Sequence, residues 1–384
     1  MIGVGEAFAP RYAQARQKFL SACQGAGLAV QSLPHPLPGR DGEALAMDVA
    51  LDGDSRSQHL LLLTSACHGV EGHCGSGVQV FALHDAEWRE TARAQGVAVL
   101  YVHGLNPHGF SHGRRVTHEN VDINRNFLDF SAPLPVNEAY ASLHALLLPE
   151  QWPPTAQNEA ALMAWVGEHG AGAFQEAVSG GQYQFEDGLF FGGKAPTWSN
   201  LNFREVLRTH AQAARKLAWI DLHTGLGPSG LGERIFACRD DKAAYARANA
   251  WWGSPAAPVT SIYDGSSTSA LLTGLNWSAV YEECPQAEYT GIAMEYGTLP
   301  LMEVMMALRG DHWLHKHPEA SAELAASIRA ATLEAFYTDT DSWRGQIISQ
   351  ARQAMFQAVE GLRPAPGRSQ GGLRPPSGGS DHTK

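Results

Sequence analysis

The feature that most constrains this chain is an aliphatic run that ends in a histidine and a glutamate. Residues 60–74 read LLLLTSACHGVEGHC. A short aliphatic run bounded by glycine-containing sequence is typical of a buried strand. We expect His68 and Glu71 to follow this strand on a tight turn, at the carboxyl end where open α/β sheets bind ligands. Zinc accepts such an imidazole–carboxylate pair, but a site needs a third ligand from elsewhere in the chain.

The rest of the chain alternates between buried strands and helical patterns. Further strands are predicted at 44–49, 97–102, 217–222, 234–238 and 291–296. Helices are predicted at 8–23, 78–94, 136–148, 158–169, 203–216 and, with breaks, 301–362. This alternation predicts one α/β domain, residues 1–362, with a mixed, mostly parallel central sheet and helices on both faces. Residues 363–384 are rich in Pro, Gly and Ser, and we expect a disordered tail there.

Composition narrows the class of protein. The chain has 384 residues, of which 44% are hydrophobic and 17% charged, as in ordinary globular proteins. The net charge of −11 argues against a nucleic-acid partner, which requires a basic face. No apolar run approaches the length of a membrane span, and the amino terminus does not read as a secretory signal. Five cysteines without a CxxC motif predict no disulfide framework and favour the cytoplasm.

Two more strands end in residues that suit a hydrolytic metal site. His223 ends the strand at 217–222, and Glu295 lies near the end of the strand at 291–296. Two imidazoles and one carboxylate leave a fourth zinc position open, as in catalytic sites. Glu295 is then the candidate for a carboxylate that takes a proton from water and passes it to a leaving amine. Each residue alone is compatible with a structural role, and His73 is an alternative ligand.

The polar loop at residues 109–127 carries an arginine cluster, in which Arg114, Arg115 and Arg125 are joined by Asn124. Guanidinium groups hold carboxylates and stabilise oxyanions, so the loop is a candidate anion site. In the alternative interpretation, these arginines pair with acidic residues on a solvated loop. The acidic residues in question are Glu119, Asp122 and Asp129. The charge pattern alone favours this second interpretation.

Five motifs, taken in order, resemble a known superfamily. They are HGVEG, NPHGFSHGRR, NVDINRNF, DLHTG and AMEYGT, and they span residues 60–298. In this order they resemble the zinc carboxypeptidase (M14-like) superfamily, which includes the aspartoacylase and succinylglutamate desuccinylase branch. The sequence is most similar to the bacterial DUF2817 group. The resemblance implies a zinc carboxypeptidase-like fold.

The resemblance also implies a metal site and its chemistry. It implies one zinc ion per chain, with His68, Glu71 and His223 as ligands. Glu295 matches the general base and acid. Asp122 matches an aspartate that forms a hydrogen bond with the first zinc histidine and so fixes its tautomer.

The arginine loop receives its roles from the same resemblance. Arg125, together with Asn124, matches the pair that grips a terminal carboxylate of the substrate. Arg115 matches the arginine that stabilises the oxyanion, and Arg114 is the alternative after a shift of one residue. This match changes the interpretation of the loop from solvated ion pairs to a functional site.

The implied function is hydrolysis of an amide bond next to a free carboxylate, in a small peptide or an N-acyl amino acid. The alternatives are a deacylase of the aspartoacylase or succinylglutamate desuccinylase type and a non-catalytic carboxylate-binding homologue. The digestive carboxypeptidases carry a mobile tyrosine ahead of the catalytic glutamate. Candidates for that position here are Tyr263, Tyr281 and Tyr289. Candidates for an apolar pocket wall are Phe190, Phe191 and Trp198.

Overall fold

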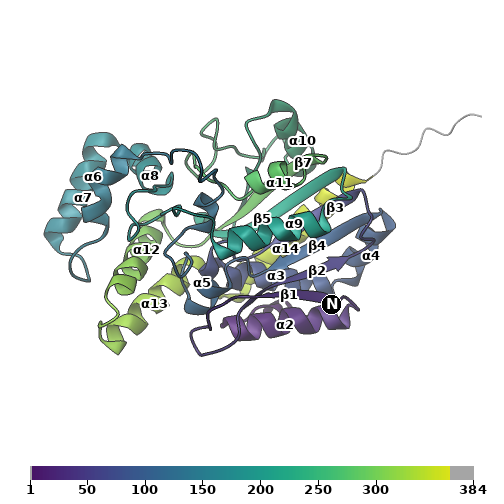
Figure 1. Ribbon diagram of the computed structural model, residues 1–384, viewed down its shortest axis with the longest axis horizontal. Coiled ribbons are helices and arrows are strands. Elements are labelled where there is room, and N and C mark those ends of the chain that lie inside the picture. Colours follow the sequence, from purple (N-terminus) through teal and green to yellow (C-terminus); the bar gives the residue numbers. More distant parts are fainter. Residues whose placement is uncertain (1, 364–384) are drawn as a thin grey trace, which may run out of the picture.

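A seven-stranded mixed sheet forms the centre of the computed structural model, which describes residues 2–363 (Figure 1). Its strand order is β1-β2-β4-β3-β5-β7-β6. The strands are β1 (Val30–Pro34), β2 (Ala46–Asp52), β3 (His59–Thr64), β4 (Val97–His103), β5 (Lys216–Ser229), β6 (Gly232–Phe236) and β7 (Glu288–Gly297). The α/β class and the mixed sheet predicted from the sequence are confirmed. The tail predicted at 363–384 lies outside the described residues, apart from Arg363.

The inner strands β4, β3, β5 and β7 run parallel, whereas the outer strands β1, β2 and β6 pair antiparallel. Parallel strands are covered on both faces, so their sequences read as continuous apolar runs rather than alternating ones. This explains why LLLL in β3 and VAVLYV in β4 are buried at every position. The shared direction of the inner strands places all their carboxyl ends along one edge of the sheet.

The chain changes direction across the sheet at β3. It leaves β3 for β4 on one side and later returns to β5 on the other side. Ligands of open α/β sheets bind in the crevice at such a switch point, outside the carboxyl ends of the strands. In register, Thr64 of β3 pairs with Asp221 of β5, and His223 pairs with Glu295 of β7. The topology therefore places the three predicted strand ends side by side.

Helices cover both faces of the sheet. Figure 1 shows α9 (Trp198–His210) in front of the sheet and α14 (Asp341–Leu362) behind it. Side chains alternate along β5, so Trp219 packs on Phe203 of α9 with ring centroids 5.2 Å apart, whereas Leu222 faces α3 (Gly72–His84). A Cβ at Gly75 would lie 2.7 Å from Ser65 Cβ. Only glycine there lets α3 approach the end of β3.

A helical lobe extends from the sheet beside its carboxyl edge (Figure 1). It consists of α6 (Glu138–Leu147), α7 (Ala156–His169), α8 (Ala171–Ser179), α12 (Leu301–Lys316) and α13 (Ala322–Phe336). The lobe has an apolar core of its own, to which α6, α8 and α12 contribute Leu143, Phe174 and Leu308. The remaining helices are α1 (Val4–Ala7), α2 (Tyr12–Gly25), α4 (Ala86–Ala94), α5 (Pro107–His112), α10 (Lys242–Trp252) and α11 (Ser278–Glu283).

Several element boundaries differ from the predicted ones. The helix predicted at 78–94 is two helices, because Asp85 ends α3 and its carboxylate accepts from Trp88 N at 3.2 Å to cap α4. Strand β1 and helices α1, α5, α8, α10 and α11 were not predicted. Within residues 2–363, no helix is long and apolar enough to cross a membrane. All five cysteines are buried and unpaired, as expected.

Candidate metal centre and active site

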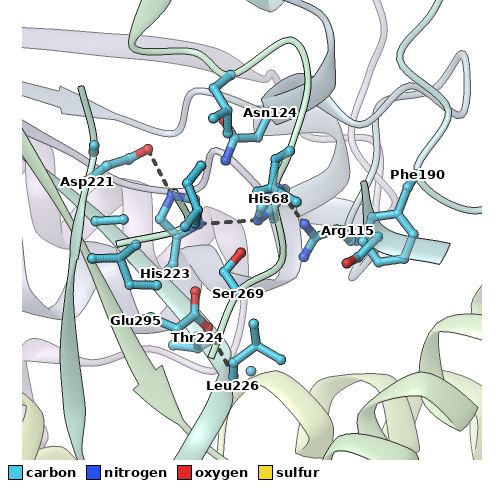
Figure 2. Close-up of a pocket in the computed structure, with 18 of the residues that line it drawn as sticks. His68, Arg115, Asn124, Phe190, Asp221, His223, Thr224, Leu226, Ser269 and Glu295 are labelled. Atoms are coloured by element: carbon cyan, nitrogen blue, oxygen red, sulfur yellow. Dashed lines mark hydrogen bonds and ion pairs between the residues drawn. The ribbon is translucent and has the colours of Figure 1, made fainter. Parts of the chain in front are cut away.

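The carboxyl ends of β3 and β5 bring three of the predicted residues together. His68 follows β3, Glu71 ends the short helix η1 (Gly69–Glu71), and His223 lies in β5. His68 Nδ1 is 2.9 Å from Glu71 Oε1, and His223 Nδ1 is 3.1 Å from Glu71 Oε2. The two Nδ1 atoms are 3.3 Å apart (Figure 2). All three side chains are buried, so residues from distant parts of the chain converge on one point.

The turn that carries His68 and Glu71 is fixed by the arginine loop. Gly69 N donates to Arg115 O at 3.0 Å, and Val70 N donates to Arg114 O at 2.9 Å. A Cβ at Gly69 would lie 2.1 Å from the carbonyl carbon of Gly109, so glycine is needed for this contact with α5. The backbone of the loop therefore determines where the two candidate ligands point.

Each histidine has a carboxylate on its other ring nitrogen. His68 Nε2 lies 3.1 Å from Asp122 Oδ1, and His223 Nε2 lies 2.8 Å from Asp221 Oδ2. A carboxylate can only accept, so each histidine donates from Nε2 to its aspartate and from Nδ1 to Glu71 when it is protonated on both nitrogens, and a bound cation would replace the Nδ1 protons. Such partners orient metal-binding histidines and raise their basicity. Sequence reasoning identified Asp122 but missed the role of Asp221, although the DLH motif places it on the same face of β5.

The chemistry of this cluster fits a divalent cation. Both Nδ1 atoms converge on the Glu71 carboxylate, and a cation held by all three groups would take the place of the Nδ1 protons. Burial raises the pKa of the Glu71 carboxyl, but the charges and hydrogen bonds of His68 and His223 outweigh it and hold this pKa well below its usual value. Two nitrogens and one carboxylate oxygen match the donor set of catalytic zinc sites.

A second group of possible ligands shares one histidine with the first. It consists of Cys67, Asp221 and His223. Burial raises the pKa of the Cys67 thiol well above its usual value, and the Asp221 carboxylate is already engaged by His223 Nε2 and Asn276 Nδ2 at 2.8 and 2.7 Å. The alternative ligand His73 is also a poor candidate, because its ring lies in the core, where Nδ1 is 2.9 Å from Ala9 O. The first group is therefore the better metal site.

Glu295 lies in β7, below His223 in Figure 2, and is 9% exposed. Its Oε1 accepts from Leu226 N at 3.0 Å, which fixes one oxygen. Burial, reinforced by the negative charge of Glu71, raises the pKa of the Glu295 carboxyl to about 8. A carboxyl group with a raised pKa beside a candidate metal site suits general acid–base chemistry.

The two adjacent arginines point to different places. Arg115 lines the pocket, where its Nε donates to Asp122 at 3.0 Å and its Nη1 donates to Glu71 at 3.1 Å. Its Nη2 lies 2.8 Å from His68 Nε2, and the N–H groups of Nη1 and Nη2 that these contacts do not use are the donors left for a substrate oxygen. Arg114 instead turns to Asp311 on α12, with Nε 3.0 Å from Oδ2. The prediction that Arg114 binds substrate is therefore not supported by its position.

Asn124 and Arg125 both line the pocket. Arg125 Nε and Nη2 donate to Ser179 O at 3.0 and 2.6 Å, and Nη1 donates to Asn124 O at 2.7 Å. All these acceptors are neutral carbonyls, and within residues 2–363 no carboxylate pairs with this buried guanidinium. Figure 2 shows the side-chain nitrogen of Asn124 directed toward the pocket. The pair can thus receive an anion from the pocket.

The pocket lies between the carboxyl edge of the sheet and the helical lobe. It encloses about 1070 Å³, including the part open to solvent. Polar groups gather at the metal cluster, whereas the opposite walls are apolar. These walls include Ile235, Ile262, Leu275, Val304, Met305 and Leu308. This division of the walls suits a small ligand with a polar end and an apolar end.

Of the residues predicted to form the pocket wall and of the candidate tyrosines, only some reach the pocket. Phe190 lines the pocket and stacks under Arg115, whose Cζ is 5.1 Å from the ring centroid. Neither Phe191 nor Trp198 lines it, and none of the three candidate tyrosines does. The tyrosine hydroxyls form hydrogen bonds with nearby backbone atoms instead. Tyr263 donates to Cys238 O, Tyr281 accepts from Arg239 N, and Tyr289 donates to Ala237 O. Ser269, which sequence reasoning missed because nothing distinguishes it within a serine-rich loop, is directed into the pocket (Figure 2).

Fold and site together define an α/β protein with a buried His–Glu–His cluster at the carboxyl edge of its sheet. The chain belongs to the family described as "Protein of unknown function (DUF2817)", whose profile matches residues 8–350. The resemblance inferred from the motifs is thus confirmed for this family. No curated protein sequence matches the chain.

Two solved structures with a similar course of the chain can be compared. Bovine thrombin-activatable fibrinolysis inhibitor, in complex with tick carboxypeptidase inhibitor, is 11% identical, with 84% of this chain and 96% of that chain covered and a TM-score of 0.45. An aspartoacylase family protein from Mesorhizobium loti is 14% identical, with 75% and 66% covered and a TM-score of 0.37. Scores this low support no conclusion about what the present chain binds or does.

Proposed function

We propose that this protein is a zinc-dependent hydrolase that cleaves an amide bond next to a free carboxylate. One observation carries the proposal. A ligand set of His68, Glu71 and His223 shares one pocket with a carboxyl group whose pKa is raised and with a buried arginine that faces no carboxylate. These are the parts that such a reaction needs, and they come from strands and loops far apart in the sequence.

His68, Glu71 and His223 would hold the ion, one per chain. When bound, zinc supplies a Lewis acid that polarises a carbonyl group and lowers the pKa of water. Asp122 and Asp221 hold Nε2 of the two imidazoles, so that each Nδ1 faces the position of the ion. The protein residues therefore provide an oriented, buried donor set.

Glu295 moves the proton in this proposal. As a carboxylate it accepts a proton from the attacking water, and as a carboxylic acid it donates that proton to the leaving amine. Its Oε1 is held by Leu226 N, which leaves Oε2 for the transfer. Arg115 donates from an unused guanidinium N–H to the oxyanion that develops on the scissile carbonyl.

Arg125 and Asn124 orient the substrate through its carboxylate. A guanidinium fork binds a carboxylate in a fixed plane, so the scissile bond is placed at a set distance from the anchor. The apolar walls formed by Ile262, Leu275 and Met305 favour an apolar side chain at this end of the substrate. Five unpaired, buried cysteines support a reducing compartment such as the cytoplasm.

The test replaces Glu295 with glutamine, which keeps the shape of the side chain and removes the base. We expect turnover to fall by about 10²–10⁴-fold while zinc content stays at one per chain. Glu288→Gln, at the exposed start of the same strand, is the matched control and should keep full activity. Appreciable turnover by Glu295→Gln would reject the role of Glu295.

The substrate panel should contain peptides with a free carboxyl terminus, their carboxyl-terminal amides, and N-acyl amino acids. Cleavage of the free peptides alone would support a carboxypeptidase, and deacylation alone would support an acyl amino acid hydrolase. A zinc-loaded protein that hydrolyses none of them would indicate a carboxylate-binding homologue instead.

A further inference from the structure

A second pocket lies outside the proposed active site, among α5, α12 and α13, which are neighbours in Figure 1. Arg114 forms part of its wall, and its backbone adjoins that of Arg115, which lines the first pocket. Two more arginines reach it from separate elements, Arg40 from the loop before β2 and Arg329 from α13. The proposed function uses none of these three guanidinium groups.

Positive charge predominates in this second pocket. Asp311 is its one acidic wall residue, and Arg114 already occupies it, with Nε 3.1 and 3.0 Å from the two carboxylate oxygens. Within residues 2–363, neither Arg40 nor Arg329 has an ion-pair partner. Burial lowers the pKa of the Arg329 guanidinium, and the positive charge of the nearby Arg40 lowers it further. Like charges thus converge in a chain whose net charge is −11.

Arg114 has an unsatisfied donor in this pocket. Its side chain is 9% exposed, and its Nη2 donates to Asn120 Oδ1 at 3.1 Å. Its Nη1 is buried without a partner. A buried N–H without an acceptor is unfavourable, and such groups in native proteins usually indicate a ligand or water. An acceptor supplied from the pocket would satisfy it.

Two neutral histidines complete the polar wall of this pocket. His112 of α5 and His315 of α12 both line the pocket. Burial lowers the pKa of His112, and burial with the charge of Arg114 lowers that of His315 to about 4. At neutral pH each ring is therefore uncharged and carries one N–H, and His112 already gives its N–H to the backbone carbonyl of Pro38. The donors that the pocket offers an anion are therefore chiefly guanidinium groups, which come from three elements.

We propose that this pocket binds a phosphate group, either as inorganic phosphate or as a phosphomonoester. A carboxylate is planar and is matched by a single guanidinium fork, whereas donors from three elements surround a tetrahedral anion. Asp311 and Asn120 hold the Arg114 side chain in place at the base of the pocket. Arg40 and Arg329 would contact the anion from the rim. A bound dianion offsets the repulsion among the three arginines.

The test is calorimetric titration of the full chain, treated with a chelator, with inorganic phosphate at constant ionic strength. We expect one site per chain and affinity at least about tenfold weaker in Arg40→Ala and in Arg329→Ala. Arg56→Ala, an exposed arginine near β3, removes the same charge and should bind like wild type. Equal affinity in all four proteins, or no binding by wild type, would overturn the proposal.

Two further titrations show where the anion binds and which form of phosphate it is. Arg125→Ala should bind phosphate like wild type, and weaker binding by this variant would show that the anion sits in the first pocket, contrary to the proposal. Titration with glycerol phosphate separates the sources: tighter binding than inorganic phosphate indicates a phosphomonoester, and weaker binding indicates the free anion. Whichever form binds more tightly, its affinity must be lower in Arg40→Ala and in Arg329→Ala than in wild type.

Discussion

At the residue scale, the candidate site depends on which way neighbouring side chains turn. Arg114 and Arg115 are adjacent, yet one faces Asp311 and the other faces Glu71. Sequence reasoning left this choice open, because the direction of each side chain is set by the backbone contacts of Gly69 and Val70 with the loop. The HxxE pair was predictable, since both residues belong to one turn. Convergence with His223 depends on strand order, which the sequence does not specify.

Arg125 gives a prediction at this scale. Replacement by alanine should raise KM for a peptide with a free carboxyl terminus and lower kcat/KM by about 10–100-fold, because a charge-assisted anchor is lost. The measurement is steady-state kinetics on matched substrates. The carboxyl-terminal amide of the same peptide is the control, since wild type and variant should cleave it equally slowly. An equal loss on both substrates would mean that Arg125 has a structural role.

At the element scale, the strands were easier to predict than the helical lobe. The apolar runs of β3, β4 and β5 are buried on both faces and stand out in the sequence. The lobe was predicted only in part, and α8 was missed, because its burial depends on packing against α6 and α7 rather than on its own periodicity. The break between α3 and α4 likewise follows from one capping carboxylate.

The lobe is tied together by Arg309 of α12, and this gives a prediction at the element scale. Its guanidinium donates to Leu146 O and Leu147 O of α6 and to Glu159 Oε1 of α7, at 3.1, 3.0 and 2.7 Å. Arg309→Met should lower the free energy of unfolding by about 2–4 kcal/mol, because two backbone carbonyls of α6 lose their donor, whereas the Glu159 side chain is 35% exposed and can be solvated. Hydrogen exchange should rise in α6 and α7.

Lys316→Met is the control for Arg309→Met. This lysine lies on the same helix, and its ion pair with Asp187 is partly exposed. Its loss should cost no more than about 1 kcal/mol. Equal effects of the two substitutions in urea denaturation would contradict the assigned role of Arg309.

At the scale of the whole molecule, acid should destabilise the fold through buried neutral histidines. His103 ends β4, stacks on Phe19 with ring centroids 4.5 Å apart, and lies 2.9 Å from Ser76 Oγ through Nε2. Burial lowers its pKa from 6.5 to about 4. Between these values the unfolded chain binds a proton that the folded protein does not, so stability decreases as the pH falls.

The contribution of His103 between pH 7 and pH 5 should be about 2 kcal/mol. Urea denaturation of chelator-treated wild type and His103→Gln at both pH values measures it as the difference between their pH dependences. His169→Gln, an exposed histidine on α7, should behave like wild type. A pH dependence that His103→Gln leaves unchanged would assign the acid sensitivity to other groups.

Metal binding should couple the site to the stability of the entire fold, because His68, Glu71 and His223 come together only when β3 and β5 are paired. A ligand that binds the folded state alone raises the free energy of unfolding, by about 2.7 kcal/mol at a concentration 100 times Kd. Zinc should therefore raise the Tm of chelator-treated protein, and calorimetric scans with and without zinc measure this increase.

Two substitutions decide which residues are responsible for that increase. Glu71→Gln should abolish it, because the carboxylate that both Nδ1 atoms share is lost. Cys67→Ala should retain it, because Asp221 is already engaged by His223 and by Asn276 Nδ2 at 2.7 Å and is not free to bind the ion together with Cys67. The opposite result would move the metal to the Cys67–Asp221–His223 group. Glu71 would then be left as a buried acid between two imidazoles, and the proposed hydrolytic site would lose one of its ligands.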